Sequence, residues 1–176
     1  DTGDLMESVT ASVLGENFNS TNDENDSFDN RSDDKGPEPE GITIGYLNLG
    51  RPVAFVGLER IGGIMAFDLS DPTEPAFLTY INTRDFSGDA EAGTAGDLAP
   101  EGLTFIAASE SPTGTPLLAV SFEVSGSTRF FEIESGFGEE ICNDPGPDSF
   151  TADGFEGLEQ GGVACYSSAD DFTLDN

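Results

Sequence analysis

One stretch of the chain occurs twice, and this repeat limits the folds that the sequence can adopt. Residues 35–45 contain Pro-Glu-Gly followed by an apolar residue, Thr and a second apolar residue, and residues 96–106 contain the same pattern. The apolar runs that follow also align, residues 53–68 with residues 117–132. A repeat of about 60 residues that is rich in short strands predicts propeller blades or a related β array.

Gly, Pro and Asp residues divide the two copies into short β-rich runs, which predicts antiparallel meanders of the kind that form propeller blades. In the first copy, the predicted strands span residues 41–48, 53–59, 64–69 and 76–83. In the second copy they span residues 102–108, 117–123 and 128–134. No fourth strand is evident for the second copy.

We therefore expect an all-β chain of propeller blades that forms the C-terminal part of a larger propeller, because two blades are too few to close a ring. The remaining blades would come from another chain or from a missing segment, and the start at Asp1 without Met is typical of a processed piece. The expected organisation is the end of a preceding blade plus an acidic loop at 1–39, with a short amphipathic helix within 1–18, a complete blade at 40–83, an acidic connection at 84–100, a last blade without its fourth strand at 101–134, and a loop-rich tail at 135–176.

The chain is strongly acidic, with 6 basic and 35 acidic residues and a net charge of −29. Such a charge repels nucleic acid and anionic membranes and attracts divalent cations. An acidic surface that keeps a secreted protein soluble in salty water is the alternative. No apolar run reaches the roughly 20 residues that span a bilayer, so we expect no transmembrane segment.

The absence of histidine narrows the possible chemistry. It excludes Ser-His-Asp and Cys-His nucleophile systems and every metal site with histidine ligands. Any metal must be held by oxygen atoms, which predicts calcium, with magnesium as the alternative.

Four glutamates at equivalent places in the repeat are the candidate metal ligands. In the predicted hairpins Glu40 faces Glu59, and Glu101 faces Glu123. Like charges directly opposite on paired strands are destabilising, so a cation between them is expected. In the alternative, all four carboxylates lie at strand ends and point into water. The full predicted set of metal ligands is Glu40, Glu59, Glu101, Glu123, Asp34 and Asp97.

Four of the basic residues lie beside these acidic segments: Arg31, Lys35, Arg60 and Arg84. In a chain so short of positive charge, this grouping predicts a site for a phosphate group, such as that of a phosphate ester. Local neutralisation of the neighbouring carboxylates explains the grouping equally well.

The motifs resemble the closing blades of the choice-of-anchor I family, which includes proteins similar to mesenchyme-specific cell-surface glycoproteins and to an atypical cyanobacterial alkaline phosphatase. The resemblance covers residues 1 to about 134, and the segments that carry it are 1–4, 31–41, 54–63, 84–86, 96–102 and 123–126. It implies a β-propeller, a location outside the cell or on its surface, and either phosphate-ester hydrolysis or a calcium-linked surface role.

Two functions are therefore expected. The first is a secreted, calcium-dependent phosphoester hydrolase of the propeller type, similar to alkaline phosphatase, in which the metal polarises a phosphoryl oxygen. Its catalytic residues are unknown, because no side-chain nucleophile stands out. The alternative is a non-catalytic calcium-binding protein of a cell surface, a matrix or a filament.

The two cysteines, Cys142 and Cys165, predict a disulfide in the tail, because an even pair in an acidic, lysine-poor chain is more typical of a bridge than of a redox or metal site. The bridge would contribute about 3 kcal/mol through loop entropy. Mass spectrometry after alkylation without reduction should find both thiols protected. Alkylation of both would contradict the prediction.

Overall fold

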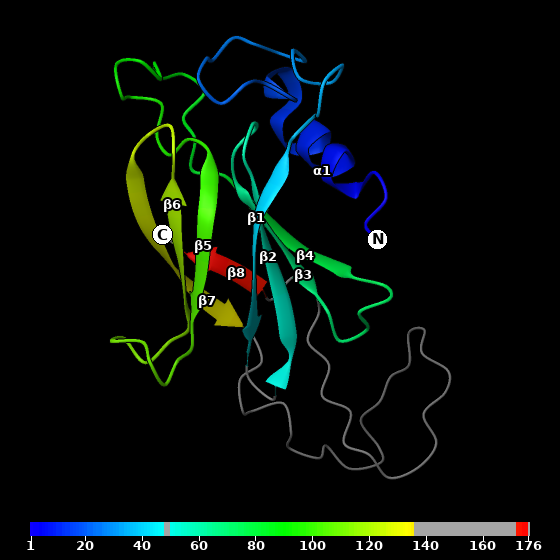
Figure 1. Cartoon of the computed structure of the whole chain (residues 1–176), viewed down its shortest axis with the longest axis vertical. Helices are drawn as coiled ribbons and strands as arrows, with labels where there is room; N and C mark the ends of the chain where they lie inside the picture. Colours follow the sequence, from blue (N-terminus) through cyan, green and yellow to red (C-terminus); the bar gives the residue numbers. More distant parts are fainter. Residues whose placement is uncertain (48–49, 136–171, 176) are drawn as a thin grey trace, which may run out of the picture.

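Two antiparallel sheets of four strands each form most of the computed structural model (Figure 1), which describes residues 1–47, 50–135 and 172–175. Sheet one comprises β1 (Pro39–Tyr46), β2 (Pro52–Leu58), β3 (Ile64–Asp68) and β4 (Ala76–Ile81). Sheet two comprises β5 (Pro100–Ile106), β6 (Leu117–Phe122), β7 (Ser127–Ser135) and β8 (Phe172–Asp175). Strand order follows chain order in both. The prediction of an all-β chain of four-stranded antiparallel blades is confirmed.

The sequence repeat is also a repeat of strand pairing. Ile42 pairs with Val56 in sheet one, as Leu103 pairs with Val120 in sheet two. The pairing of β2 with β3 matches that of β6 with β7 in the same way. The equivalence of the two copies therefore holds residue by residue.

The structure corrects one sequence expectation, which concerns the last strand of the second blade. Sheet two has a fourth strand, β8, which pairs with β7 from Glu132 to Ser135. Sequence reasoning missed it because no short turn links β8 to the strand beside it. Residues 1–38, within the segment 1–39 that was expected to hold the end of a preceding blade and an acidic loop, form the predicted helix, α1 (Leu5–Leu14), a 3₁₀ turn (Gly15–Asn17) and a loop.

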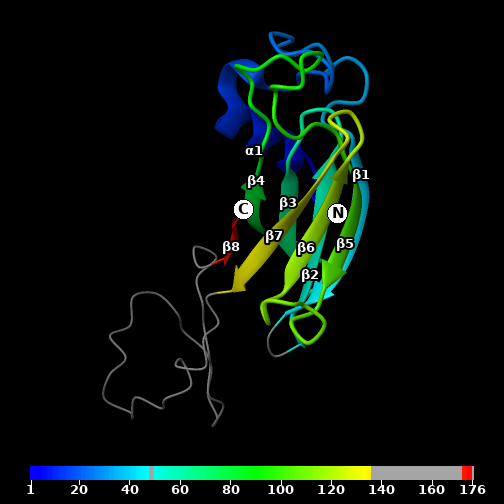
Figure 2. The ribbon, with the colours of Figure 1, turned by 90° about the vertical axis from the view of Figure 1, so that its left-hand side faces the viewer.

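The two sheets pack face to face, with β1 lying against β5 (Figure 2). A side chain added at Gly41 would come within 2.2 Å of the carbonyl oxygen of Glu101, and one at Gly45 within 2.3–2.6 Å of the Phe105 ring. The Phe105 ring stacks on Phe55, with ring centroids 6.2 Å apart. The buried side chains between the sheets are Leu47, Val53, Phe55, Ile64, Ala66, Leu118, Val120, Phe122, Phe131 and Ile133.

The helix α1 covers part of the other face of sheet one. Its apolar side chains Leu5, Met6, Val9 and Leu14 pack against a second buried cluster on that face. That cluster comprises Ala54, Val56, Leu58, Ile61, Met65 and Phe67. Sheet one is therefore covered by sheet two on one face and, in part, by α1 on the other.

We expect Gly41→Ala to lower the free energy of unfolding by about 1–3 kcal/mol, because its new methyl group would meet backbone that cannot move aside. The equivalent change in the repeat, Gly102→Ala, is the matched control, since its methyl group would meet only the rotatable hydroxyl of Ser121. Denaturant unfolding of both variants measures the difference. An equal decrease in the free energy of unfolding for both variants would show that Gly41 is not required for the close contact of the sheets.

Candidate functional site at the loop end of the sheets

Two equivalent turns begin β1 and β5 at the end of the molecule where the acidic loops gather (Figure 1). Glu38 and Ala99 each precede a proline and hold a left-handed backbone, with φ of 51° and 61°. In each turn, the carbonyl of the left-handed residue accepts a hydrogen bond from a backbone N–H. The donor is the first residue after the neighbouring strand, β2 or β6. Glu59 donates to Glu38 and Glu123 donates to Ala99, both at 2.8 Å.

The strand register that we expected, with Glu40 opposite Glu59 and Glu101 opposite Glu123, is wrong, although the side chains of Glu40 and Glu59 interact. The residue opposite Glu59 is Glu38, and the residue opposite Glu123 is Ala99, each two positions before the expected glutamate. The pairing of β1 with β2 is shifted by one residue from that expected, and that of β5 with β6 likewise. A further shift follows each proline, within residues 39–42 and 100–102, because a β-bulge there inserts an extra residue.

Three of the four glutamates, Glu40, Glu101 and Glu123, are exposed, whereas Glu59 is 7% exposed. Within residues 1–47, 50–135 and 172–175, no three acidic, cysteine or histidine side chains are arranged to hold a metal ion. The calcium site that we inferred from the sequence stays a prediction.

Glu59 is buried at this end of the sheets. Burial raises the pKa of its carboxyl, Arg60 opposes that shift, and the nearby Glu40 and Glu38 add to it. Its Oε1 accepts a hydrogen bond of 2.9 Å from Nδ2 of Asn22, and its Oε2 lies 3.4 Å from Nε of Arg60. The ionised form of Glu59 is thus disfavoured by its burial.

Glu38 forms ion pairs with three basic side chains. Its Oε1 accepts hydrogen bonds from Nη2 of Arg31 at 2.6 Å and from Nε of Arg60 at 3.2 Å, and its Oε2 lies 3.5 Å from Nζ of Lys35. Burial opposes ionisation of this carboxyl, but the two arginines outweigh it and lower the pKa of Glu38. The same hydrogen bond raises the pKa of Arg31, which also pairs with Asp34 at 2.9 Å.

Arg84 ties the acidic loop to the connection between the sheets. Its Nε and Nη2 donate to Oδ1 of Asn25 at 3.1 and 2.8 Å, and Nη2 also donates to the Glu24 carbonyl at 2.8 Å. Its Nη1 donates to the Arg60 carbonyl at 3.3 Å, and its guanidinium carbon lies 4.5 Å from the centre of the Phe86 ring. Burial lowers the pKa of Arg84 to about 10. The side chain acts as an internal anchor.

Asp97, predicted as a metal ligand, is also a structural anchor. Its carboxylate accepts hydrogen bonds from Thr83 at 2.9 Å and Ser127 at 2.6 Å, and it pairs with Arg129. Burial opposes its ionisation, but these partners together lower the pKa of Asp97. The other predicted ligand, Asp34, is exposed beside Arg31.

The structure therefore brings the four predicted phosphate-binding cations close to carboxylates and amides of the chain itself. Sequence reasoning missed Glu38, Asn22 and Asn25, on which these contacts depend. A signal for Glu38 existed in the Pro-Glu-Pro-Glu-Gly stretch. The repeat does not point to this residue, because its second copy has Ala99 at the equivalent place.

Comparison with known proteins agrees with the sequence resemblance. Residues 1–72 match the choice-of-anchor I domain, which confirms the resemblance and indicates a surface or extracellular role. Gigasin-3a of Magallana gigas is 29% identical over 143 residues, which is 76% of this chain and 50% of that protein. The chain thus spans about half the length of this curated relative. No solved structure matches the chain significantly. No helix in the described residues is long and apolar enough to cross a membrane.

The opposite pKa shifts of Glu38 and Glu59 give a test of this arrangement. Glu38→Gln should lower the free energy of unfolding at pH 7 by about 1.5–3 kcal/mol, because it removes charged hydrogen bonds. Since the pKa of Glu38 is lowered, its contribution is present above the ordinary glutamate pKa of about 4.3 and is lost as the pH falls through the folded value.

Glu59→Gln should behave in the opposite way. Because the pKa of Glu59 is raised, the wild type loses stability as the pH rises from about 4.3 through the folded value, and the glutamine variant should not. Denaturant unfolding between pH 3.5 and 7 compares the two variants. The same sign of change for both variants at pH 7 would contradict the assignment.

Proposed function

We propose that this chain is a non-catalytic, calcium-binding part of a cell-surface or extracellular protein. The observation that carries this proposal is that the basic side chains are already paired within the chain. The chain has six basic residues, and each has a carboxylate or amide partner within the chain: Arg31 and Lys35 with Glu38, Arg51 with Asp68, Arg60 with Glu38, Arg84 with Asn25, and Arg129 with Asp97.

A phosphoester hydrolase needs cations that can be offered to the phosphoryl oxygens. In this structure the arginines nearest the acidic loops are already used in holding those loops in place. The calcium-dependent hydrolase expected from the sequence is therefore the less favoured function, and a phosphatase assay is the direct check on it.

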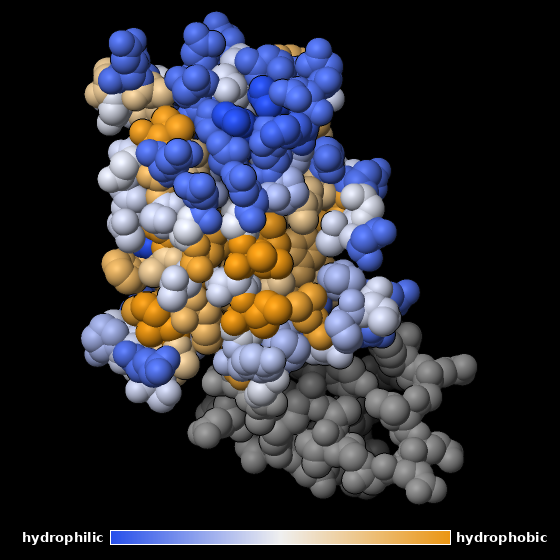
Figure 3. Space-filling model, viewed as in Figure 1, coloured by the Kyte–Doolittle hydropathy of each residue, from blue (hydrophilic) through white to orange (hydrophobic). Residues whose placement is uncertain are grey.

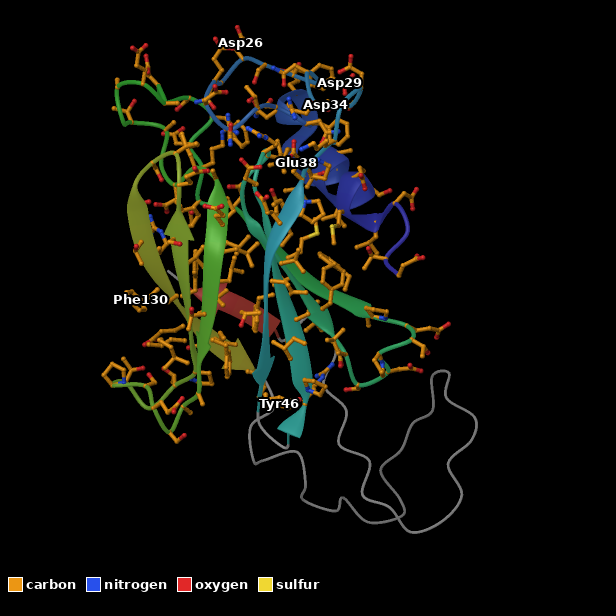
Figure 4. All side chains as sticks on the ribbon, viewed as in Figure 1. Asp26, Asp29, Asp34, Glu38, Tyr46 and Phe130 are labelled. Atoms are coloured by element: carbon orange, nitrogen blue, oxygen red, sulfur yellow. The ribbon has the colours of Figure 1, made fainter. Side chains whose placement is uncertain are left out.

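The surface of the same end is acidic. Asp26, Asp29 and Asp34 extend outward from the loop, as Figure 4 shows, and all three are exposed. Figure 3 shows hydrophilic residues gathered at this end and apolar residues over the strands. With a net charge of −29, such a surface attracts divalent cations. Glu40 and Glu101, exposed in equivalent bulges, lie at this end as well.

Calcium should raise the melting temperature of the chelator-treated chain, since a ligand at 100 times its Kd stabilises the folded state by about 2.7 kcal/mol. The double variant Glu40→Gln/Glu101→Gln should reduce this response. The control is Glu74→Gln/Glu110→Gln, which removes the same charge from exposed positions in the turns after β3 and β5, at the other end of the sheets.

Calorimetric titration with calcium and magnesium, beside an assay with a chromogenic phosphate ester, completes the test. Calcium binding without ester hydrolysis is the expected result. Calcium-dependent hydrolysis would favour the enzyme instead. An unchanged melting temperature with either ion would overturn the calcium proposal.

A further inference from the structure

The loop between the 3₁₀ turn and β1 contains three sequences that fit the acceptor pattern for an N-linked oligosaccharide, which is Asn, any residue except Pro, and then Ser or Thr. They are Asn19-Ser20-Thr21, Asn25-Asp26-Ser27 and Asn30-Arg31-Ser32, and the sequence has no others. An attached oligosaccharide is bulky and strongly hydrated, so the folded chain must present it at the surface. The surroundings of each asparagine therefore decide which of the three can carry one.

Asn19 has no room for an oligosaccharide. It is 2% exposed, and its Nδ2, the atom to which a sugar is attached, donates a hydrogen bond of 2.8 Å to Oγ of Ser32. Its carbonyl accepts a hydrogen bond of 3.1 Å from the backbone N–H of Arg31. A sugar on Asn19 would have to displace this part of the loop.

The amide of Asn25 is fully used in holding the acidic loop. Its Nδ2 donates to the carbonyl of Asp85 at 3.1 Å and to that of Gly88 at 2.6 Å, and its Oδ1 accepts from Arg84. An N-linked sugar replaces one of the two hydrogens of Nδ2, so it would break one of these bonds. It would also force the loop away from the connection between the sheets.

Asn30 differs from both of these residues. It is exposed, and its side chain has no hydrogen-bond partner among residues 1–47, 50–135 and 172–175. Both hydrogens of its Nδ2 are therefore available, and attachment of a sugar breaks no contact in the part of the chain that the structure describes.

The backbone on either side of Asn30 is held in place. The N–H of Asp29 donates to the carbonyl of Phe18 at 2.9 Å, and the N–H of Arg31 donates to that of Asn19 at 3.1 Å. Asp29 has a left-handed backbone, with φ of 59°, and its side chain extends outward from the loop (Figure 4). The loop thus presents Asn30 on a fixed backbone at the outer surface.

We propose that Asn30 is the residue of this loop that carries an N-linked oligosaccharide. A transferase of the secretory pathway moves the oligosaccharide from a polyprenyl diphosphate to Nδ2 of Asn30. The bond from C1 of the first sugar to the diphosphate oxygen breaks, the bond from C1 to Nδ2 forms, the polyprenyl diphosphate leaves, and Nδ2 loses one of its two protons. The inference rests on the location outside the cell in the proposed function, and not on calcium binding.

Expression of the full chain in cultured insect cells, behind a signal peptide that the cells remove, tests this assignment. The chain is recovered from the medium and from the cells and is treated with peptide N-glycosidase in water labelled with heavy oxygen. This treatment converts each glycosylated asparagine to a labelled aspartate, which peptide mass spectrometry locates. We expect the label at Asn30 and at neither Asn19 nor Asn25.

Asn30→Gln should lose the oligosaccharide, so its mass should not change on treatment with the glycosidase. Thr21→Ala and Ser27→Ala are the matched controls, because each removes the acceptor pattern of another asparagine and leaves that of Asn30 intact. Both should be glycosylated like the wild type. The label on the wild type is located without any substitution, so the test does not depend on the folding of a variant.

A wild type without the label at Asn30 overturns the inference, and so does a label at Asn19 or Asn25. Calcium titration of the Asn30→Gln chain measures the proposed function separately. Calcium binding by this chain, together with an unlabelled Asn30 in the wild type, would overturn only the inference. A glycosylated wild type and an Asn30→Gln chain that both fail to bind calcium would overturn only the calcium proposal.

Discussion

The structure depends on how closely two backbones approach each other at β1 and β5. Glycine at positions 41 and 45 of β1 lets the carbonyl of Glu101 and the ring of Phe105 occupy the space of the missing side chains. This contact sets the position of sheet two, and with it the positions of the second Pro-Glu-Gly turn and of Asp97. The acidic loops lie over one end because both sheets start there.

Much of the fold could be predicted from the sequence, because the repeat and the turn residues are local signals. The predicted strand from residue 53 to 59 is observed as Pro52–Leu58, and the helix expected within residues 1–18 is α1. The strand β8 could not be predicted in this way, since its place beside β7 depends on a contact between distant parts of the chain. Periodicity within a short window carries no information about such a contact.

The candidate site was harder to predict, for two physical reasons. The pairing of Glu40 with Glu59 assumed an uninterrupted hairpin, whereas a left-handed residue before each proline and the bulge after it shift the pairing. The roles of Arg60 and Arg84 depend on amides of Asn22 and Asn25, far away in the sequence. Sequence spacing places charges near one another but does not show which of them neutralise each other.

The late position of β8 in the chain has a consequence for synthesis on the ribosome. In sheet one each strand pairs with the next strand in the sequence, so the sheet can form once the chain through Ile81 has emerged. Contacts between residues that are close in sequence form fast. Sheet two must wait for Phe172–Asp175 before β7 gains its outer neighbour. During that interval β7 is an unpaired edge strand, which is the kind of surface that chaperones and other nascent chains encounter.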